Sequence, residues 1–436
     1  MKKQIVSIIL AAVTILPAGA QHLWSLRDCI DYAQEHNLSI KQKESAVEQG
    51  REDLATARWS RVPDLSASVG QKFNYGRGLK ADNTYADRNT QSTAFSLGTT
   101  VPLFTGFQLP VQRQMAGLNL KAAVEDLGKA REDISIAVTG AYLQVLFSNE
   151  LLQVAESQLN VSREVYDMKK AGFEVGRTAE KDVLEAASRV SSDELSQTQA
   201  QNEYQLNLLA LSQLLELPSP DDFGVQSPDT AILAATLPLP GEVYAEAVGA
   251  RPSVLSAVYR ARSAHKGIKL AQSGLYPKLS MSAGLGTNYY KVSGLPAQSF
   301  GDQWSDNFNK FIGFNLSIPL FNRMETRGRI RKARIQSDAA RWQLEEVKKS
   351  LFKEIQQAYY NAVAAHSRMI SGKSSEEASQ AAFRLVSANY QLGRATATEY
   401  NESRAQWLSS VSENIKARYD YIFRVKILNF YRGIPL

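Results

Sequence analysis

The segment "GRTAEKDVLEA" at residues 176–186 returns in altered form as "GRATATEYNES" at residues 393–403. Each copy opens with Gly-Arg, and each carries carboxylates six and nine positions after its glycine. These carboxylates are Asp182 and Glu185 in the first copy, and Glu399 and Glu402 in the second. A similarity repeated at a distance of 217 residues indicates that the chain is built from two related halves.

Further pairs of segments support this duplication. Two more pairs share the 217-residue offset: "VPLF" (101–104) with "IPLF" (318–321), and "AYLQ" (141–144) with "AYYN" (358–361). A third pair, "RVPDLSAS" (61–68) with "LYPKLSMS" (275–282), is separated by 214 residues. For each half we predict the same order of elements: a helix, a strand, a loop, a strand, a long helix, a tight turn and a helix. We expect a first repeat at 21–216 and a second at 242–436, joined by a linker at 217–241 that contains five prolines.

The first twenty residues have the pattern of a secretory signal peptide. Lys2 and Lys3 precede an apolar run and the small residues Ala18-Gly19-Ala20. We therefore expect residues 1–20 to be removed and the mature protein to be exported. Its formal charge falls from +6 to +4 without the two lysines, which gives no nucleic-acid signature.

The single cysteine, Cys29, permits no internal disulfide, so packing must stabilise the fold. Arg27 and Asp28 stand where a lipid-attachment site needs small residues. We expect Cys29 to be a small buried helix residue.

Alternating apolar and small or polar residues predict two strands in each half. In "TAFSLGTTVPLF" (93–104), "LSMSAGLGTNY" (279–289) and "IGFNLSIPL" (312–320), every second residue is mainly apolar. The mature chain has no apolar run long enough for a membrane helix, so a membrane form would be a β-barrel. The alternative is an ordinary half-buried soluble sheet.

Four strands cannot close a spanning barrel alone, because the smallest such barrels use about eight. Two copies of the chain would supply eight strands, and three would supply twelve and leave space for a channel. The open edges of a four-stranded sheet favour such association.

Helices make up the larger part of the chain. A helix predicted at about 111–171 carries a heptad seam suited to coiled-coil packing, and a less regular counterpart is predicted at about 325–390. Shorter helices are expected at 26–60 and 243–274. The seam consists of Ile134, Val138, Ala141, Val145, Ser148, Leu152, Ala155 and Leu159.

These features resemble the TolC family of outer-membrane efflux proteins. The likeness rests on "SLRDCIDYAQEHNLSI" (25–40), the strand exits "VPLFTGF" and "IPLFNRM", and the turns "VGRTAEKDVLEA" and "LGRATATEYNES". It implies a mixed α and β membrane protein, with a trimeric twelve-stranded outer-membrane barrel that continues into a periplasmic α-helical coiled-coil tunnel. It also implies a Gram-negative outer membrane, a periplasmic adaptor protein and an inner-membrane pump that is proton-driven or of the ABC type.

The resemblance assigns roles to both turns. Adaptor docking falls on Val175, Gly176, Arg177 and Thr178, and on Leu392, Gly393, Arg394 and Ala395. The family often has Thr directly after the glycine, whereas this chain has Arg177 and Arg394, which suggests another adaptor subtype. The tunnel entrance falls on Glu399 and Glu402, with Asp182 and Glu185 at the same offsets.

The chemistry of these carboxylates is consistent with a pore. Residues three apart lie on one helix face, and in a trimer each position becomes a ring of three carboxylates that prefers cations. The alternative is a solvated helix start, where acidic residues suit the helix dipole. For Asp182 and Glu185 the two interpretations are equally supported. For Glu399 and Glu402 the pore is favoured.

Nothing in the sequence favours an enzyme. The four histidines have no metal-ligand spacing, and "GLGTNYY" (284–290) continues a strand rather than opening a phosphate-binding helix. We expect no metal, no cofactor and no catalytic residue. The function predicted is a passive outer-membrane exit channel for efflux or type I secretion, and the alternative is a periplasmic coiled-coil scaffold or adhesin without a pore.

Overall fold

The computed structural model of the 436-residue chain describes residues 22–79, 83–219, 223–226 and 237–436. The predicted signal peptide and much of the predicted linker lie outside these residues. The described residues form two compact units, one within 22–43, 127–251 and 348–436, and one within 44–126 and 252–347. Each unit takes segments from both predicted repeats, and the repeat boundaries themselves stay a prediction.

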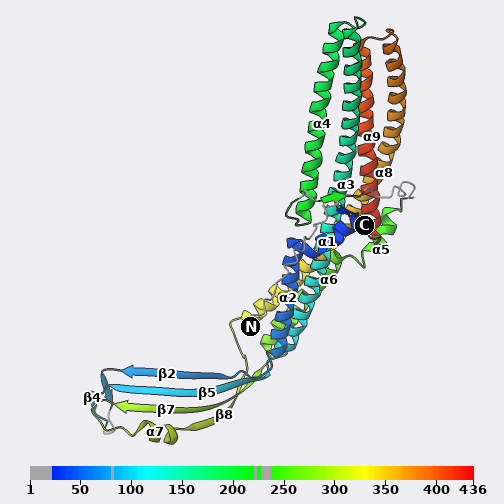
Figure 1. The fold of residues 1–436 in the computed structure, drawn as a ribbon. Helices are drawn as coiled ribbons and strands as arrows, with labels where there is room; N and C mark the ends of the chain where they lie inside the picture. Colours follow the sequence, from blue (N-terminus) through cyan, green and yellow to red (C-terminus); the bar gives the residue numbers. More distant parts are fainter. Residues whose placement is uncertain (1–21, 80–82, 220–222, 227–236) are drawn as a thin grey trace, which may run out of the picture. The chain divides into compact units, whose positions relative to one another are not determined.

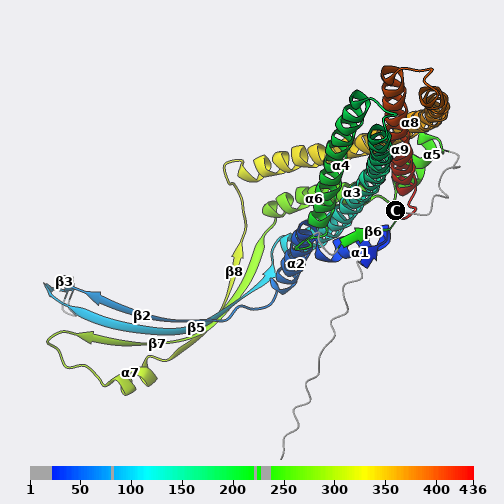
Figure 2. The ribbon, with the colours of Figure 1, turned by 45° about the horizontal axis from the view of Figure 1, so that its top comes forward.

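The first unit is built around four long helical segments. They are the second parts of α3 (Gln108–Glu174) and α8 (Glu325–Gln391), and the whole of α4 (Glu180–Leu214) and α9 (Ala397–Tyr431). Figures 1 and 2 both show them side by side. The unit also contains α1 (Leu26–His36), α5 (Pro240–Ala247), and a parallel pair of short strands, β1 (His22–Trp24) and β6 (Phe223–Val225).

The heptad seam predicted on α3 forms much of the core of this unit. Five of its eight residues are buried and the other three are half-buried. The seam on α8 is also regular, although the sequence suggested a less regular one. Its buried residues lie 217 positions after seam residues of α3, and they are Leu351, Ile355, Ala358, Ala362 and Ala365.

Helix α1 packs its apolar face onto the same core. Cys29 and Ala33 are fully buried in one cluster with Tyr142, Leu211 and Leu215. Burial raises the pKa of the Cys29 thiol to about 12, so the thiol stays protonated. The expectation that Cys29 is a small buried helix residue is confirmed.

Both predicted first helices are broken, which corrects the expectation of one continuous helix in each half. The expected helix at 26–60 is α1 followed by α2 (Leu38–Trp59), because Asn37 turns away from helical geometry. The side-chain Nδ2 of Asn37 donates to the Leu214 carbonyl at 3.1 Å, and its side-chain oxygen accepts from the Ser39 backbone amide at 2.9 Å.

The expected helix at 243–274 is α5, then α6 (Pro252–Gln272) and a single 3₁₀ turn, η2 (Ser273–Leu275). This break falls at Arg251, directly before Pro252, and proline disfavours helical geometry in the residue that precedes it. Arg251 is buried and donates to Glu132 at 2.7 Å.

The second unit contains one antiparallel sheet in the order β2-β5-β7-β8. Its strands are β2 (Ser66–Asn74), β5 (Thr90–Phe104), β7 (Lys278–Val292) and β8 (Asn309–Ser317). These are the four strands predicted, two from each half (Figure 1). The connections also contain a short hairpin of β3 (Arg77–Leu79) and β4 (Tyr85–Asp87), and a short helix α7 (Phe300–Asp306), none of which was predicted.

The register of this sheet places most of the apolar residues of the four strands on one face, whereas Phe311 lies on the other. Phe95 pairs with Val69, Leu97 with Leu285, and Phe314 with Met281. Directly paired residues lie on the same face of an antiparallel sheet. The exposed side chains on this face include Val69, Ile312, Phe314 and Leu316, at 68, 74, 67 and 57% exposure.

The opposite face carries small and polar residues such as Ser96, Gly98 and Gly286. At Gly284 a Cβ would lie 2.6 Å from the Phe311 ring, so the glycine makes space for that side chain. The glycines of "GLGTNYY" therefore lie on the small and polar face of a strand, as the alternation predicted.

No helix among the described residues is both long enough and apolar enough to cross a membrane.

Candidate functional site

The two Gly-Arg turns have the same backbone geometry. Gly176 and Gly393 both have a φ of 72°, which glycine adopts without the steric cost that a Cβ would bring. The Arg177 amide donates to the Gly172 carbonyl at 2.7 Å, and the Arg394 amide donates to the Asn389 carbonyl at 2.8 Å. The amides of the two glycines also donate to the carbonyls of Phe173 and Tyr390, at 2.9 and 3.0 Å, and these contacts form Schellman motifs that end α3 and α8.

The turns present mainly exposed side chains. Val175 and Leu392 hold matching positions, and each is 68% exposed. Arg177 and Arg394 are exposed as well, whereas Thr178 and Ala395 are half-buried. An apolar and a cationic side chain therefore stand together at each turn.

The two carboxylates of the second copy differ in their surroundings. Glu399 closes a capping box at the start of α9, where its carboxylate accepts from the Thr396 amide at 2.7 Å and from the Thr396 hydroxyl at 2.9 Å. These hydrogen bonds lower the pKa of Glu399. Glu402 is exposed and has no hydrogen bond or ion pair to any described residue.

The first copy has a simpler helix start. Its cap position is Ala179, which has no side chain to bond the Asp182 amide. Glu185 forms an exposed ion pair with Lys181 at 3.5 Å. All four carboxylates lie near the start of a helix. The pair on α4, Asp182 and Glu185, does not contact the pair on α9, Glu399 and Glu402.

A buried polar cluster lies further along the bundle, and the sequence did not indicate it. Arg404 and Asp193 are 7 and 9% exposed, and they form an ion pair at 2.7 Å. Gln158 also accepts from Arg404, and the Ser162 hydroxyl donates to Asp193. The cluster ties α9 to α4 and α3. The Arg404 guanidinium is thus bound to a carboxylate on a neighbouring helix.

Aromatic side chains join α8 to α9 on both sides of Arg404 along α9. Phe383 stacks on Trp407 with ring centroids 5.2 Å apart, and Tyr390 lies 4.9 Å from Tyr400. Arg189 of α4 lies over the Tyr400 ring at 5.4 Å. Burial, followed by the nearby Arg404 charge, lowers the pKa of Arg189. No single spacing in the sequence could predict this cluster, because its members come from three separate helices.

Among the described residues, no group of three or more His, Cys, Asp or Glu side chains is placed to hold a metal ion. The site is therefore a pair of helical-hairpin turns with carboxylates at the following helix starts, above a polar and aromatic interior.

This combination of a duplicated chain, an apolar-faced sheet and paired helical hairpins belongs to a known class. The outer membrane efflux protein family matches the chain over residues 29–216 and 243–429, and the chain is a member of that family. Membership confirms the resemblance that the turns and strand exits indicated, and it favours an outer-membrane channel over a scaffold without a pore.

Particular relatives are distant in sequence but cover most of the chain. The chain is 22% identical to the outer membrane efflux protein BepC of Brucella suis biovar 1 (strain 1330), over 97% of this chain and 88% of the relative. It is also 22% identical to the outer membrane protein TolC of Escherichia coli (strain K12), over 91% of this chain and 80% of the relative.

The fold agrees with a solved structure. The crystal structure of the Campylobacter jejuni CmeC outer membrane channel superposes with a TM-score of 0.77 at 18% identity, over 94% of this chain and 85% of that one. The mixed helix and sheet fold class is thereby confirmed, while the number of copies and the closure of a barrel stay predictions.

Proposed function

We propose that this chain is the passive exit duct of an efflux or type I secretion assembly in the outer membrane of a Gram-negative bacterium. Three copies contribute twelve strands to one closed barrel, and their helices form the periplasmic tunnel. The sheet carries this proposal, because one face is mainly apolar across all four strands and includes exposed side chains such as Val69, Ile312 and Phe314. Such a face suits lipid, and the edge strands β2 and β8 suit pairing with neighbouring copies.

The duplication fits this assembly. In the proposal, residues 1–20 are the signal peptide, 21–216 and 242–436 are the repeats, and 217–241 join them. Each repeat supplies two strands and one long helical hairpin, so a trimer has twelve strands and six hairpin turns. The duct itself binds no cofactor and catalyses no reaction, and energy comes from an inner-membrane pump.

The hairpin turns are the proposed docking surface for a periplasmic adaptor. Exposed Val175 and Leu392 offer apolar contacts, and Arg177 and Arg394 beside them offer charge-assisted hydrogen bonds to acidic residues of the adaptor. Their rigid Schellman geometry supports docking, because a preorganised surface loses little entropy on binding.

The carboxylates at the helix starts are the proposed tunnel entrance. Glu402, which has no partner among the described residues, is free to contribute to a ring of three charges. Glu399 contributes its charge from a capping position, and Asp182 and Glu185 hold the corresponding places in the first hairpin.

Conductance in a planar lipid bilayer tests this function. The purified protein should form cation-preferring pores, whereas a scaffold or adhesin would form none. Phe314→Lys, on the apolar face, should abolish pore formation because a lysine in lipid costs about 2–4 kcal/mol. Asn315→Lys, on the opposite face of the same strand, is the matched control and should still conduct. Absence of pores in the unmodified protein would refute the proposal.

A further inference from the structure

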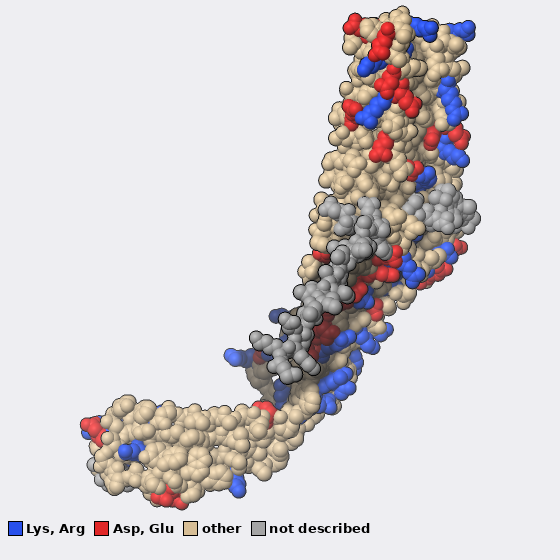
Figure 3. Space-filling model, in the orientation of Figure 1, with Lys and Arg blue, Asp and Glu red and all other residues tan. Residues whose placement is uncertain are grey.

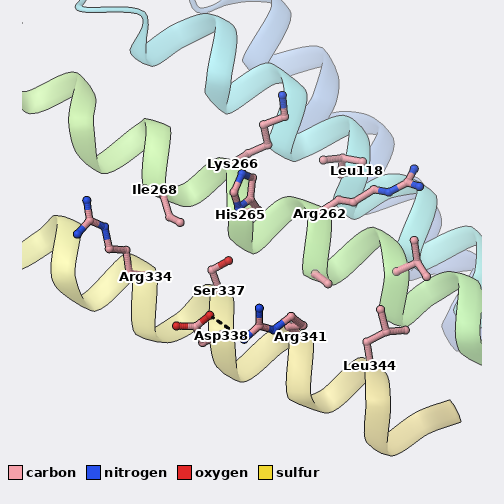
Figure 4. A pocket seen from close by; sticks show the side chains of 12 residues that line it. Leu118, Arg262, His265, Lys266, Ile268, Arg334, Ser337, Asp338, Arg341 and Leu344 are labelled. Carbon is pink, nitrogen blue, oxygen red and sulfur yellow. Dashed lines mark ion pairs between the residues drawn. The ribbon is translucent and has the colours of Figure 1, made fainter.

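A groove of about 750 Å³ lies among three helices of the second unit. Helix α6 forms one wall, α8 forms the other, and Leu118 of α3 adds to the side (Figure 4). In Figure 4, Ile268 points from α6 toward α8, and Leu344 points from α8 toward α6. The apolar lining consists of Leu118, Val258, Ala261, Ile268 and Leu344.

The polar lining of the groove is mainly cationic. Arg262 and Lys266 come from α6, and Arg334 and Arg341 come from α8. The one carboxylate is Asp338, which pairs with Arg341 at 3.5 Å. Four cations and one carboxylate leave a formal excess of three positive charges.

Most of this charge has no partner in the chain. Within the described ranges, Arg262, Lys266 and Arg334 have no hydrogen bond or ion pair, in contrast to Arg260, which lies 2.5 Å from Asp126. Residues 252–272 of α6 contain no Asp or Glu. Figure 3 shows Lys and Arg side chains gathered over the helical part of this unit.

We propose that this groove binds an amphiphilic organic anion, a molecule with one carboxylate, sulfate or phosphate group and an apolar chain. The apolar residues receive the chain, and the anionic group binds to the cationic side chains at the margin of the groove, which lie at different places along it (Figure 4). A volume of about 750 Å³ lies within the range of small-molecule sites, which are mostly apolar with a few polar groups that fix orientation.

Charge decides the class of ligand. A neutral amphiphile would leave three cations without counter-charges, whereas an anion forms charge-assisted hydrogen bonds to guanidinium and ammonium groups. A cationic amphiphile would be repelled. The proposal does not depend on pore formation, because it concerns a surface groove within one unit.

Binding of a fluorescent sixteen-carbon carboxylate to the full assembled protein, in a non-ionic detergent, tests the site. The carboxylate should bind at least tenfold more tightly than the corresponding alcohol, and added salt should weaken its binding. Lys266→Gln combined with Arg334→Gln should weaken binding by about tenfold or more.

Arg331→Gln is the matched control, since it removes one exposed cation from the same helix at a position that does not line the groove. It should leave binding of the carboxylate unchanged. Ile268→Asn should weaken the binding of long chains more than that of short ones. Equal binding of acid and alcohol, an equal loss in Arg331→Gln, or no binding to the assembled protein would overturn the proposal.

The source of the anion is a separate question with its own experiment. The protein is placed in bilayer discs of neutral lipid, and anionic phosphatidylglycerol is added in one set and a water-soluble alkyl sulfate in the other. Displacement of the probe by phosphatidylglycerol would identify a membrane lipid as the occupant. Displacement by the alkyl sulfate alone would identify a free amphiphile, and displacement by neither would contradict the site.

Discussion

Gly393 holds a backbone conformation that other residues adopt at a cost. Its φ of 72° lets the Arg394 amide reach the Asn389 carbonyl. Gly393→Ala should therefore cost about 1 kcal/mol, and should lower hydrogen-exchange protection at the end of α8 by about fivefold. Gly328→Ala, at a helical position with open space around it, should not reduce protection. Equal protection in Gly393→Ala and the unmodified protein would show that the turn does not need glycine.

The capping box of α9 should depend on pH. The folded-state pKa of Glu399 lies below its ordinary value of 4.5, because the Thr396 amide and hydroxyl bond the carboxylate. Its stabilising effect is therefore fully present above about pH 4.5, and is lost as the pH falls through the lowered folded-state pKa. The protection factor of amides at the start of α9, which compares their exchange with the intrinsic rate at each pH, should fall over that acidic range. Thr396→Val should remove this dependence, and a dependence that persists in the variant would exclude the capping box as its cause.

At the scale of whole helices, the buried ion pair of Arg404 and Asp193 holds α9 against α4. Asp193→Leu leaves Arg404 buried without a counter-charge, and should destabilise local packing of these helices by about 3 kcal/mol. Adding Arg404→Leu should recover part of this loss, because no charge then remains buried alone. Glu194→Leu breaks the exposed pair with Arg163, and should cost less than about 1 kcal/mol. Hydrogen exchange in α4 and α9 measures each change, and similar effects of the two single variants would contradict this role for the pair.

The sequence predicted elements whose periodicity is local. The seam from Ile134 to Leu159 is visible because a heptad pattern depends only on spacing along one helix. The break at Asn37 was missed, since it depends on a hydrogen bond to Leu214, 177 residues away. The pairing of β1 with β6 was missed for the same reason, as three-residue strands have no detectable alternation.

The candidate site shows the same division between local and distant information. The turns at Gly176 and Gly393 were predicted from glycine and the repeat, and both have the geometry of a helix end. The partner of Arg404 could not be predicted, because Asp193 lies on another helix and one spacing in a single sequence does not relate them.

At the scale of the whole molecule, the duplication places two kinds of surface on one chain. Each half supplies half of the apolar-faced sheet in one unit and one hairpin turn in the other. Neither half could close a barrel or form a four-helix bundle alone. In a trimer of such chains, each carboxylate that faces the tunnel would occur three times and form a ring. A single substitution in the sequence would therefore change three side chains in the channel.

Selectivity of the assembled channel should therefore respond to single carboxylates in α9. Glu402 is exposed and unbonded within the described residues, whereas Glu399 is held by Thr396. A ring of free carboxylates attracts cations more strongly than one whose oxygens already accept hydrogen bonds. Glu402→Gln should thus reduce cation preference in planar bilayers, measured as a shift in reversal potential under a salt gradient, more than Glu399→Gln does. Glu413→Gln removes an exposed carboxylate eleven residues further along the same helix, and should leave the reversal potential unchanged. An unchanged potential in Glu402→Gln, or an equal shift in Glu413→Gln, would place the entrance elsewhere in the tunnel.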